Sequence, residues 1–209
     1  MEIVKATEAH VPAYADQIAD LFHATGPASY DYQFATRELF DKLVNASWSA
    51  PGTLFAYDET TFALDGDELL GIEVGFQGPG FKQRKKALNP LWVQMIESGE
   101  VRPEELAELG ERTYLCSYLN PSIPQNVYYI HALSVKEQYR GKKIGARLLD
   151  DAMDKAKAAG FRGLPLDFLS DNPAVSFYES MGLKCLVKTV APIPLQHGVP
   201  MELRMAIDF

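Results

Sequence analysis

The stretch HALSVKEQYRGKKIGARLLDDAMDKAKAAG, residues 131–160, decides the fold. Its apolar run ends at Val135, a mostly polar turn with Gly141 and Gly145 follows, and apolar residues then recur with helical spacing. The turn also carries three basic residues, Arg140, Lys142 and Lys143. Amides at the start of a helix, together with the positive end of its dipole, favour an anion such as phosphate. The residues alone leave two alternatives open: a tight turn that serves packing, or a cradle for phosphate.

Two common phosphate-binding motifs are absent from this turn. It lacks GxxxxGK[ST], so it is not a P-loop, and it lacks GxGxxG, the dinucleotide fingerprint. Any phosphate held here therefore belongs to another class of site.

The composition is that of a globular protein. With 209 residues, of which 47% are hydrophobic and 23% charged, the chain suits one domain with a sizeable core. The formal net charge of -8 disfavours nucleic acid as a partner. The two cysteines form no metal-ligand cluster, so we expect no metal and a reduced setting. Because the sequence shows neither a signal peptide nor an apolar run of the ~18 residues that span a bilayer, we expect a cytoplasmic protein without a membrane partner.

The N-terminal part of the chain contains helical and strand patterns. Apolar residues between Tyr14 and Phe22 form a helical stripe, which Gly26-Pro27 is expected to end, and residues 35–45 predict a second helix. Two apolar runs about Asp65-Gly66 predict a β-hairpin.

Residues 77–126 interrupt this order. The segment is long for a loop and lacks strong strand signals, so it is interpreted as an insertion with short helices of its own, near 91–98 and 103–109. Its basic run FKQRKKA is interpreted as a solvated face. The insertion directly precedes a strand, so we expect it to cover a pocket there.

The C-terminal part alternates strands and helices. VYYIHALSV is apolar on both faces, as expected of a central strand, and GLPLDFL predicts another. Asn172 and Pro173 suit the start of a helix that Gly182 ends, and two further strands follow. The order predicts a mixed α/β sheet with helices on its faces.

Two motifs in this part resemble the GNAT superfamily of acetyl-CoA-dependent N-acetyltransferases. QYRGKKIGARLL resembles the family's pyrophosphate loop, [Q/R]-x-x-G-x-[G/A], with Arg140 at the first position and Gly145 at the last. Lys143 stands where a glycine is usual. NPAVSFYESMGL, which begins at Asn172, resembles the downstream signature N-x-x-A-x-x-F-Y-x-x-x-G-[FL].

The resemblance implies a fold for the whole chain. The expected structure is a single GNAT-like domain over residues 1–209, a mixed and mostly antiparallel sheet with helices on both faces, splayed central strands and a helical insertion at about 77–126. Since GNAT enzymes are often dimeric, a homodimer is possible.

The resemblance also implies a site for acetyl-CoA. Backbone amides of Leu133 and Val135 are expected along the acetyl group and the pantetheine, and Asn172 near the pantetheine arm. The pyrophosphate is expected on the residues of the turn, Arg140, Gly141, Lys142, Lys143, Ile144, Gly145 and Ala146.

Acetyl transfer to an amine also needs a base and an acid. Tyr178 is the candidate acid for the departing thiolate, although its spacing from Ala174 and Met181 also fits a plain core stripe. His131 is the candidate base; it is expected to share the face of Leu133 by strand alternation, and HALSV resembles the histidine-bearing strand of the arylalkylamine N-acetyltransferases. A hydrogen-bonded core histidine is the alternative. Glu73 is the reserve base, or otherwise an exposed strand residue.

The predicted function is therefore transfer of an acetyl group from acetyl-CoA, as cosubstrate, to a primary amine by direct attack in a ternary complex. A small amine is the first expectation for the acceptor. A protein N-terminus or lysine is the alternative acceptor, and a non-catalytic acyl-CoA sensor is the alternative of another class. Tyr30, Tyr32, Phe34 and Asp31 of GPASYDYQF suit an aromatic or cationic acceptor. Packing between helices is an equal alternative for these residues.

Overall fold

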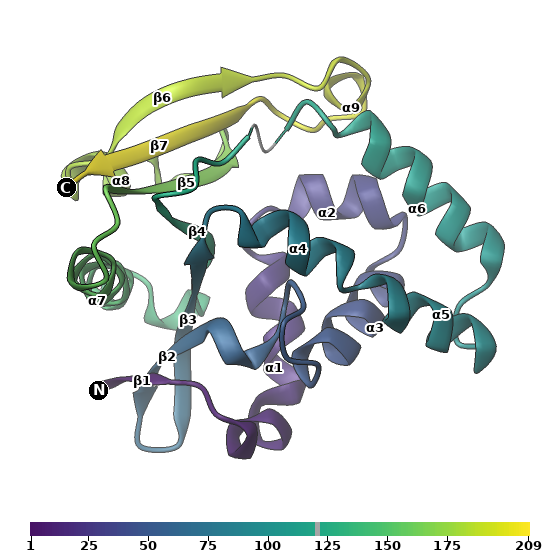
Figure 1. The fold of residues 1–209 in the computed structure, drawn as a ribbon, viewed down its shortest axis with the longest axis horizontal. Helices are drawn as coiled ribbons and strands as arrows, with labels where there is room; N and C mark the ends of the chain where they lie inside the picture. Colours follow the sequence, from purple (N-terminus) through teal and green to yellow (C-terminus); the bar gives the residue numbers. More distant parts are fainter. Residues whose placement is uncertain (120–121) are drawn as a thin grey trace.

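A computed structural model describes residues 1–119 and 122–209. Residues 120 and 121, which fall within the predicted insertion, lie outside the described residues. The described part contains one seven-stranded sheet of order β1-β2-β3-β4-β5-β7-β6 (Figure 1). The strands are β1 (Glu2–Lys5), β2 (Thr60–Asp65), β3 (Glu68–Gln77), β4 (Tyr128–Val135), β5 (Gly163–Leu169), β6 (Lys184–Thr189) and β7 (Glu202–Asp208).

Helices connect these strands. The α-helices are α1 (Val11–His23), α2 (Pro27–Phe34), α3 (Arg37–Trp48), α4 (Gly80–Lys86), α5 (Asn89–Glu97), α6 (Pro103–Leu115), α7 (Ile144–Ala158), α8 (Val175–Ser180) and α9 (Pro192–Gln196). Short 3-10 helices span Glu8–His10, Tyr57–Glu59 and Glu137–Tyr139. Across residues 1–119 and 122–209, no helix combines the length and apolarity that a membrane crossing requires.

The sheet is mixed and mostly antiparallel, as the sequence predicts. Neighbouring strands run antiparallel except β4 and β5, which are parallel. Figure 1 shows α7 on one side of β2, β3 and β4, with α1 and α3 on the other. Separate apolar clusters fill the two sides, so the predicted helices on both faces of the sheet are confirmed.

Helix α7 follows from the spacing of its apolar residues. Ile144, Leu148, Leu149, Ala152 and Ala156 recur with helical periodicity, and all five are buried against the sheet side of the helix. The chain leaves the helix at Gly160, whose φ of +78° lies in the left-handed region that glycine adopts without strain. This helix fixes the position of the turn that precedes it.

The central strands β4 and β5 diverge. Ile130 opposite Leu166 is their one pair in register, whereas β3 and β4 pair from Gly71–Val135 to Gln77–Tyr128. Beyond Ile130 the edge of β4 that faces β5 therefore has no strand partner in the described chain. The predicted splay between the central strands is present.

Strand β4 contains a bulge at His131. Val74 lies opposite Ala132 and Gly75 opposite Ile130, so His131 is an extra residue without an opposite partner. As a result His131 and Ala132 both face the layer of α1, α3 and α4, while Leu133 packs on the α7 side. The expectation that His131 shares the face of Leu133 is wrong, because the bulge interrupts the alternation.

Three α-helices were not expected from the sequence: α2, α4 and α9. The Gly26-Pro27 pair separates α1 from α2 as well as ending the first helix, since proline also suits the first turn of a helix. Helix α9 begins with a proline for the same reason. Helix α6 continues through Gly110, where the sequence predicts its end, and runs to Leu115.

Candidate active site

The turn between β4 and α7 has an unusual backbone. Gly141 has a φ of +77° and Lys143 a φ of +62°, both in the left-handed region. For a residue with a Cβ this conformation costs roughly 1–2 kcal/mol. The chain thus accepts strain at Lys143, the position where the sequence departs from the family's glycine.

No neighbouring side chain crowds the backbone of the turn at Gly141 or Gly145. A Cβ built on Gly141 meets nothing within 4 Å, and one on Gly145 meets its nearest atoms, on Phe177 and Val135, only at 3.7 Å. Packing therefore does not require a glycine at position 145. The chain has one there even though glycine destabilises a helix by about 0.5–1 kcal/mol relative to alanine. Open amides at a helix start are what a phosphate needs, so the residues present fit a pyrophosphate.

Basic side chains surround this open backbone. Arg140, Lys142 and Lys143 are all exposed. The Arg140 Nε donates a hydrogen bond of 3.2 Å to the Val135 carbonyl, and the Lys142 ammonium lies 5.0 Å from the centre of the Tyr139 ring. Ile144 is buried and anchors the first turn of α7, while Ala146 is half-buried. The seven predicted pyrophosphate residues thus form one loop with an exposed, positively charged side.

The amides of Leu133 and Val135 point into the gap between β4 and β5. The Lys136 amide donates to the Leu70 carbonyl of β3 at 2.9 Å. Because successive amides of a strand point to opposite edges, those of Val135 and Leu133 point away from β3. Strand β5 has already diverged at this level, so both amides are available to a ligand in the gap.

A cavity of about 360 Å³ opens from this gap. Its inner part is lined by residues of β4 and β5 around Ile130–Leu133 and Leu166–Leu169, together with Asn172 and Tyr178. Its outer part is lined by α2 and by the insertion, including Tyr30, Phe34, Phe81, Lys85, Leu88, Trp92, Leu106 and Leu109. The helices α4, α5 and α6 of the insertion thus form one wall of the cavity.

His131 of β4 lines the inner part of the cavity, among aromatic rings. Its ring centre is 5.6 Å from that of Phe55 and 5.8 Å from that of Phe81. The Nε2 atom is buried and has no hydrogen-bond partner among the described residues. Burial, and to a lesser degree the charge of Lys85, lowers the pKa of His131 from 6.5 to about 4. The imidazole is therefore neutral at pH 7, and its buried Nε2 is left without a hydrogen-bond partner in the described part of the chain.

Tyr178 and Asn172 line the inner part of the cavity. The Tyr178 ring packs 5.0 Å from that of Phe168, and burial raises the pKa of its hydroxyl. Asn172 does not cap α8 directly: its Oδ1 accepts a 2.9 Å bond from the Ala174 amide, and α8 begins at Val175. The signature spacing N-x-x-A also places its asparagine one residue earlier, where this chain has Asp171.

Glu73 lies on the other face of the sheet. It is buried, so the alternative of an exposed strand residue is wrong. The Tyr128 hydroxyl donates to its Oε1 at 3.2 Å, and burial raises the pKa of the carboxyl from 4.5 to about 7. Over the described residues, the lining of the cavity includes His131 but not Glu73.

The basic run on α4 is more than a solvated face. Arg84 is largely buried and pairs with Glu59, and Lys85 lines the cavity one helical turn after Phe81. The apolar spacing from Phe81 to Leu88 was the available signal for this inward face. Tyr30 and Phe34 line the cavity as well, whereas Asp31 pairs with His23 at 2.7 Å.

Comparisons with known proteins agree on one fold. Over 100% of this chain and 99% of the other, the structure of an acetyltransferase superimposes with a TM-score of 0.67 at 23% identity. An N-acetyltransferase from Staphylococcus aureus Mu50 gives a TM-score of 0.71 at 14% identity, over 99% and 100% of the two chains. The PaiA N-acetyltransferase from Thermoplasma acidophilum, solved in complex with coenzyme A, gives 0.53 at 16% identity, over 100% and 98%. No curated protein matches the chain in sequence.

A family match decides the identity. Residues 113–183 match the acetyltransferase (GNAT) family, a range that contains the turn before α7, Asn172 and Tyr178. The matched segment is GNAT-like in sequence, and the whole chain has the fold of the acetyltransferases named above. The predicted family is confirmed, as is the predicted class of enzyme, an acetyl-CoA-dependent N-acetyltransferase. The helices α4, α5 and α6 lie between β3 and β4, at the place of the predicted insertion.

Proposed function

We propose that this GNAT enzyme moves the acetyl group of acetyl-CoA to the primary amine of a small molecule, by direct attack in a ternary complex. The observation that carries the proposal is the continuous cavity of about 360 Å³ that joins the β4–β5 gap to a chamber walled by α2 and the insertion. That volume lies in the range of roughly 300–1,000 Å³ typical of small-molecule sites. A chamber walled by helices favours a compact acceptor over a polypeptide.

In this proposal the open loop and the free strand edge hold the cosubstrate. The amides and basic side chains of residues 140–146 bind the pyrophosphate, and the amides of Leu133 and Val135 bind the pantetheine and polarise the thioester carbonyl. Asn172 contacts the pantetheine arm. Acetyl-CoA supplies the activated acyl group, and every other step belongs to side chains of the cavity.

His131 is the proposed base, because it lines the cavity in which the amine must lie and its Nε2 has no partner among the described residues. The burial that lowers its pKa also favours the neutral form of an amine beside it. The amine can then attack in its neutral form, and the neutral imidazole of His131 accepts the proton that the amine loses, directly or through water. The proposal does not use Glu73, which lies beneath α7.

Tyr178 is the proposed acid for the departing thiolate. Its hydroxyl stays protonated at neutral pH, because burial raises a pKa that is already well above that of a thiol. It lines the inner cavity near the strand edge of β4. Both features suit a donor that protonates sulfur as the thioester breaks.

Release of coenzyme A thiol with a panel of primary amines tests the function. Amine-dependent thiol release, with the acetylated amine as product, supports it. Gly145→Trp should abolish acetyl-CoA binding by filling the loop, whereas Gly145→Ala, whose Cβ has room, should retain it. Binding of acetyl-CoA without transfer to any amine or peptide would favour the alternative of a sensor.

A further inference from the structure

Lys85 places a positive charge in the wall of the acceptor chamber. It follows Phe81 by one turn of α4, and Phe81 packs against the ring of His131. Lys85 lines the cavity and keeps accessible surface, so a molecule in the chamber can reach its ammonium. The ammonium is also close enough to His131 to lower the pKa of the imidazole. A bound acceptor would therefore lie between the proposed base and this charge.

The charge of Lys85 has no counterion in the described part of the chain. No carboxylate there forms an ion pair with it, although its neighbour Arg84 pairs with both Asp58 and Glu59. Burial lowers the pKa of Lys85. The group that acts in the opposite sense is the Cys116 thiol, which is neutral at pH 7 because burial raises its own pKa to about 11. Among the described residues that line the cavity, Lys85 is the one lysine or arginine.

The carboxylates that line the cavity are engaged elsewhere. Asp167 receives two hydrogen bonds from the guanidinium of Arg204, at 2.8 and 2.6 Å. Glu202 accepts a bond of 3.4 Å from Thr189 and lies on β7 beside that guanidinium. The rest of the outer chamber is largely apolar and aromatic, and its polar side chains are neutral: Thr25, Ser29, Gln33, Asn89 and Thr113. A second positive charge on the acceptor would find no free carboxylate among these residues.

We propose that the acceptor is an aromatic or aliphatic primary amine that also carries an acidic group, and that Lys85 binds this group. The inference rests on the proposed acetyl transfer and names its acceptor class. The acid then supplies the missing counterion, while the hydrocarbon body packs against the aromatic wall. A diamine or polyamine is disfavoured by the same charge. A charge-assisted hydrogen bond to a carboxylate should improve kcat/KM by about 10- to 100-fold.

Matched acceptor pairs that differ only in the carboxylate provide the test. Suitable pairs are 4-(aminomethyl)benzoate with benzylamine, and phenylalanine with phenethylamine. For each pair, kcat/KM is measured with the wild type, Lys85→Met, Lys85→Arg and the matched control Lys86→Met. Lys86 is an exposed neighbour on α4 that is not among the described residues of the cavity lining.

The wild type should prefer the carboxylated member of at least one pair by 10-fold or more, mainly through a lower KM. Lys85→Met should reduce that ratio towards one, Lys85→Arg should retain much of it, and Lys86→Met should not change it. Transfer without a carboxylate preference, or a preference that survives Lys85→Met, overturns the role of Lys85 and leaves the proposed function intact. No transfer to any amine overturns the proposed function itself.

Discussion

The Tyr129 hydroxyl donates a hydrogen bond of 3.1 Å to Asp167 Oδ2, across the point where β4 and β5 separate. Tyr129 precedes Ile130, and Asp167 follows Leu166, which are the two residues of the one registered pair between these strands. The side-chain bond therefore closes the apex of the gap beside the backbone pairing. Arg204 of β7 holds the same carboxylate, so three strands are joined at the origin of the cleft.

The ion pair at this apex should be essential for stability. The side chains of Arg204 and Asp167 are 7% and 1% exposed, so removing one leaves the other charge buried. We expect Arg204→Met to lower the free energy of unfolding by about 3–5 kcal/mol, and the double variant Arg204→Met/Asp167→Leu to recover part of that loss. Urea titration measures both. A loss below about 1 kcal/mol for the single variant would contradict a closed, charged apex.

Replacing Lys143 with glycine should stabilise the protein and weaken the binding of acetyl-CoA. Lys143→Gly removes the strain of a φ of +62°, for an expected gain of about 1 kcal/mol, but it also removes a charge from the loop. Lys142→Gly is the matched control, since it loses the same charge at a position without a positive φ. It should destabilise the protein, and both variants should raise the KM for acetyl-CoA several-fold. Equal effects of the two on the unfolding temperature would refute the strain argument.

The buried carboxyl of Glu73 should make stability fall as pH rises. Its pKa is about 7 in the folded protein against 4.5 as its ordinary value, so the folded state holds the proton more tightly than the unfolded state. The associated stability is complete below pH 4.5 and is lost by pH 7, a change of about 3 kcal/mol. Glu73→Gln should remove this dependence. Denaturant titrations of both proteins from pH 4.5 to 8 measure the difference, and parallel curves would disprove the assignment.

The pH–rate profile should identify His131. With its pKa near 4, the acidic limb of kcat/KM that His131 controls should lie near pH 4 and not near 6.5. His131→Gln should lower kcat by about 100-fold, remove this limb and leave the KM for acetyl-CoA within twofold. Steady-state rates from pH 4 to 9 with a subsaturating amine give the profile of kcat/KM. If the limb persists in His131→Gln, another group is the base.

The sequence carried enough information for the sheet and the cosubstrate loop, because their signals are local. The apolar run before Val135, the helical stripe after Ile144 and the glycines between them lie within one short stretch. The same locality explains the match of residues 113–183 to the family. Strain at Lys143 was foreseeable too, since the family has a glycine there.

The orientation of His131 depended on a feature without a local signal. After the single extra residue in β4, each side chain points to the opposite face from the one that strict alternation predicts. Nothing in HALSV marks this bulge. The burial of Glu73 also depends on tertiary contacts that the sequence does not mark. Gly75 leaves room for its carboxylate and for the Tyr128 ring, because a Cβ there would lie 2.4 Å from Glu73 Oε1.

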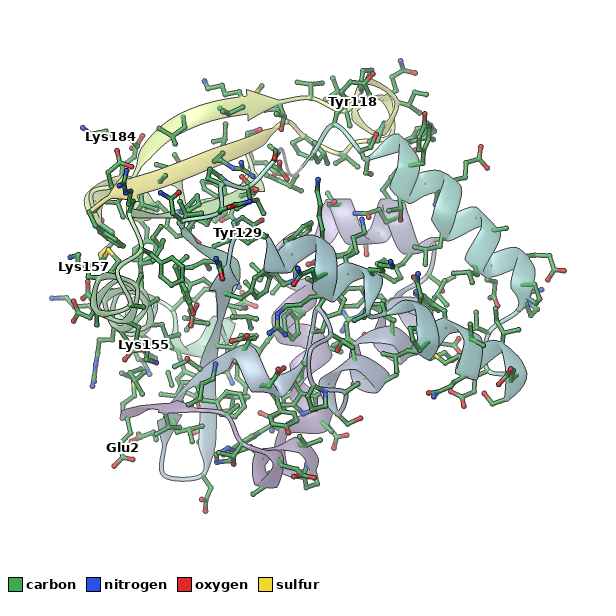
Figure 2. All side chains as sticks on the ribbon, viewed as in Figure 1. Glu2, Tyr118, Tyr129, Lys155, Lys157 and Lys184 are labelled. Atoms are coloured by element: carbon green, nitrogen blue, oxygen red, sulfur yellow. The ribbon has the colours of Figure 1, made fainter. Side chains whose placement is uncertain are left out.

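The proposed acceptor chamber could be predicted only in part, because its wall comes from distant segments. The sequence pointed to the insertion and to Tyr30 and Phe34, but not to which of their neighbours face the cavity. Residues of α2, α4, α5 and α6 meet there, and the role of Lys85 depends on which turn of α4 faces the cavity. Figure 2 shows how densely side chains fill the interior around the sheet, with Tyr129 beside the central strands and Lys155 and Lys157 on α7. Packing of this kind follows from tertiary structure and not from periodicity.

The central claim is that the gap between β4 and β5 and the turn before α7 form one binding site for acetyl-CoA. A crystal structure of the protein with coenzyme A tests it most directly. We expect the pyrophosphate on the amides of residues 141–146 and the thiol end beside Leu133 and Tyr178, at the mouth of the chamber that holds His131. Coenzyme A bound elsewhere, with this loop and gap empty, would contradict the account.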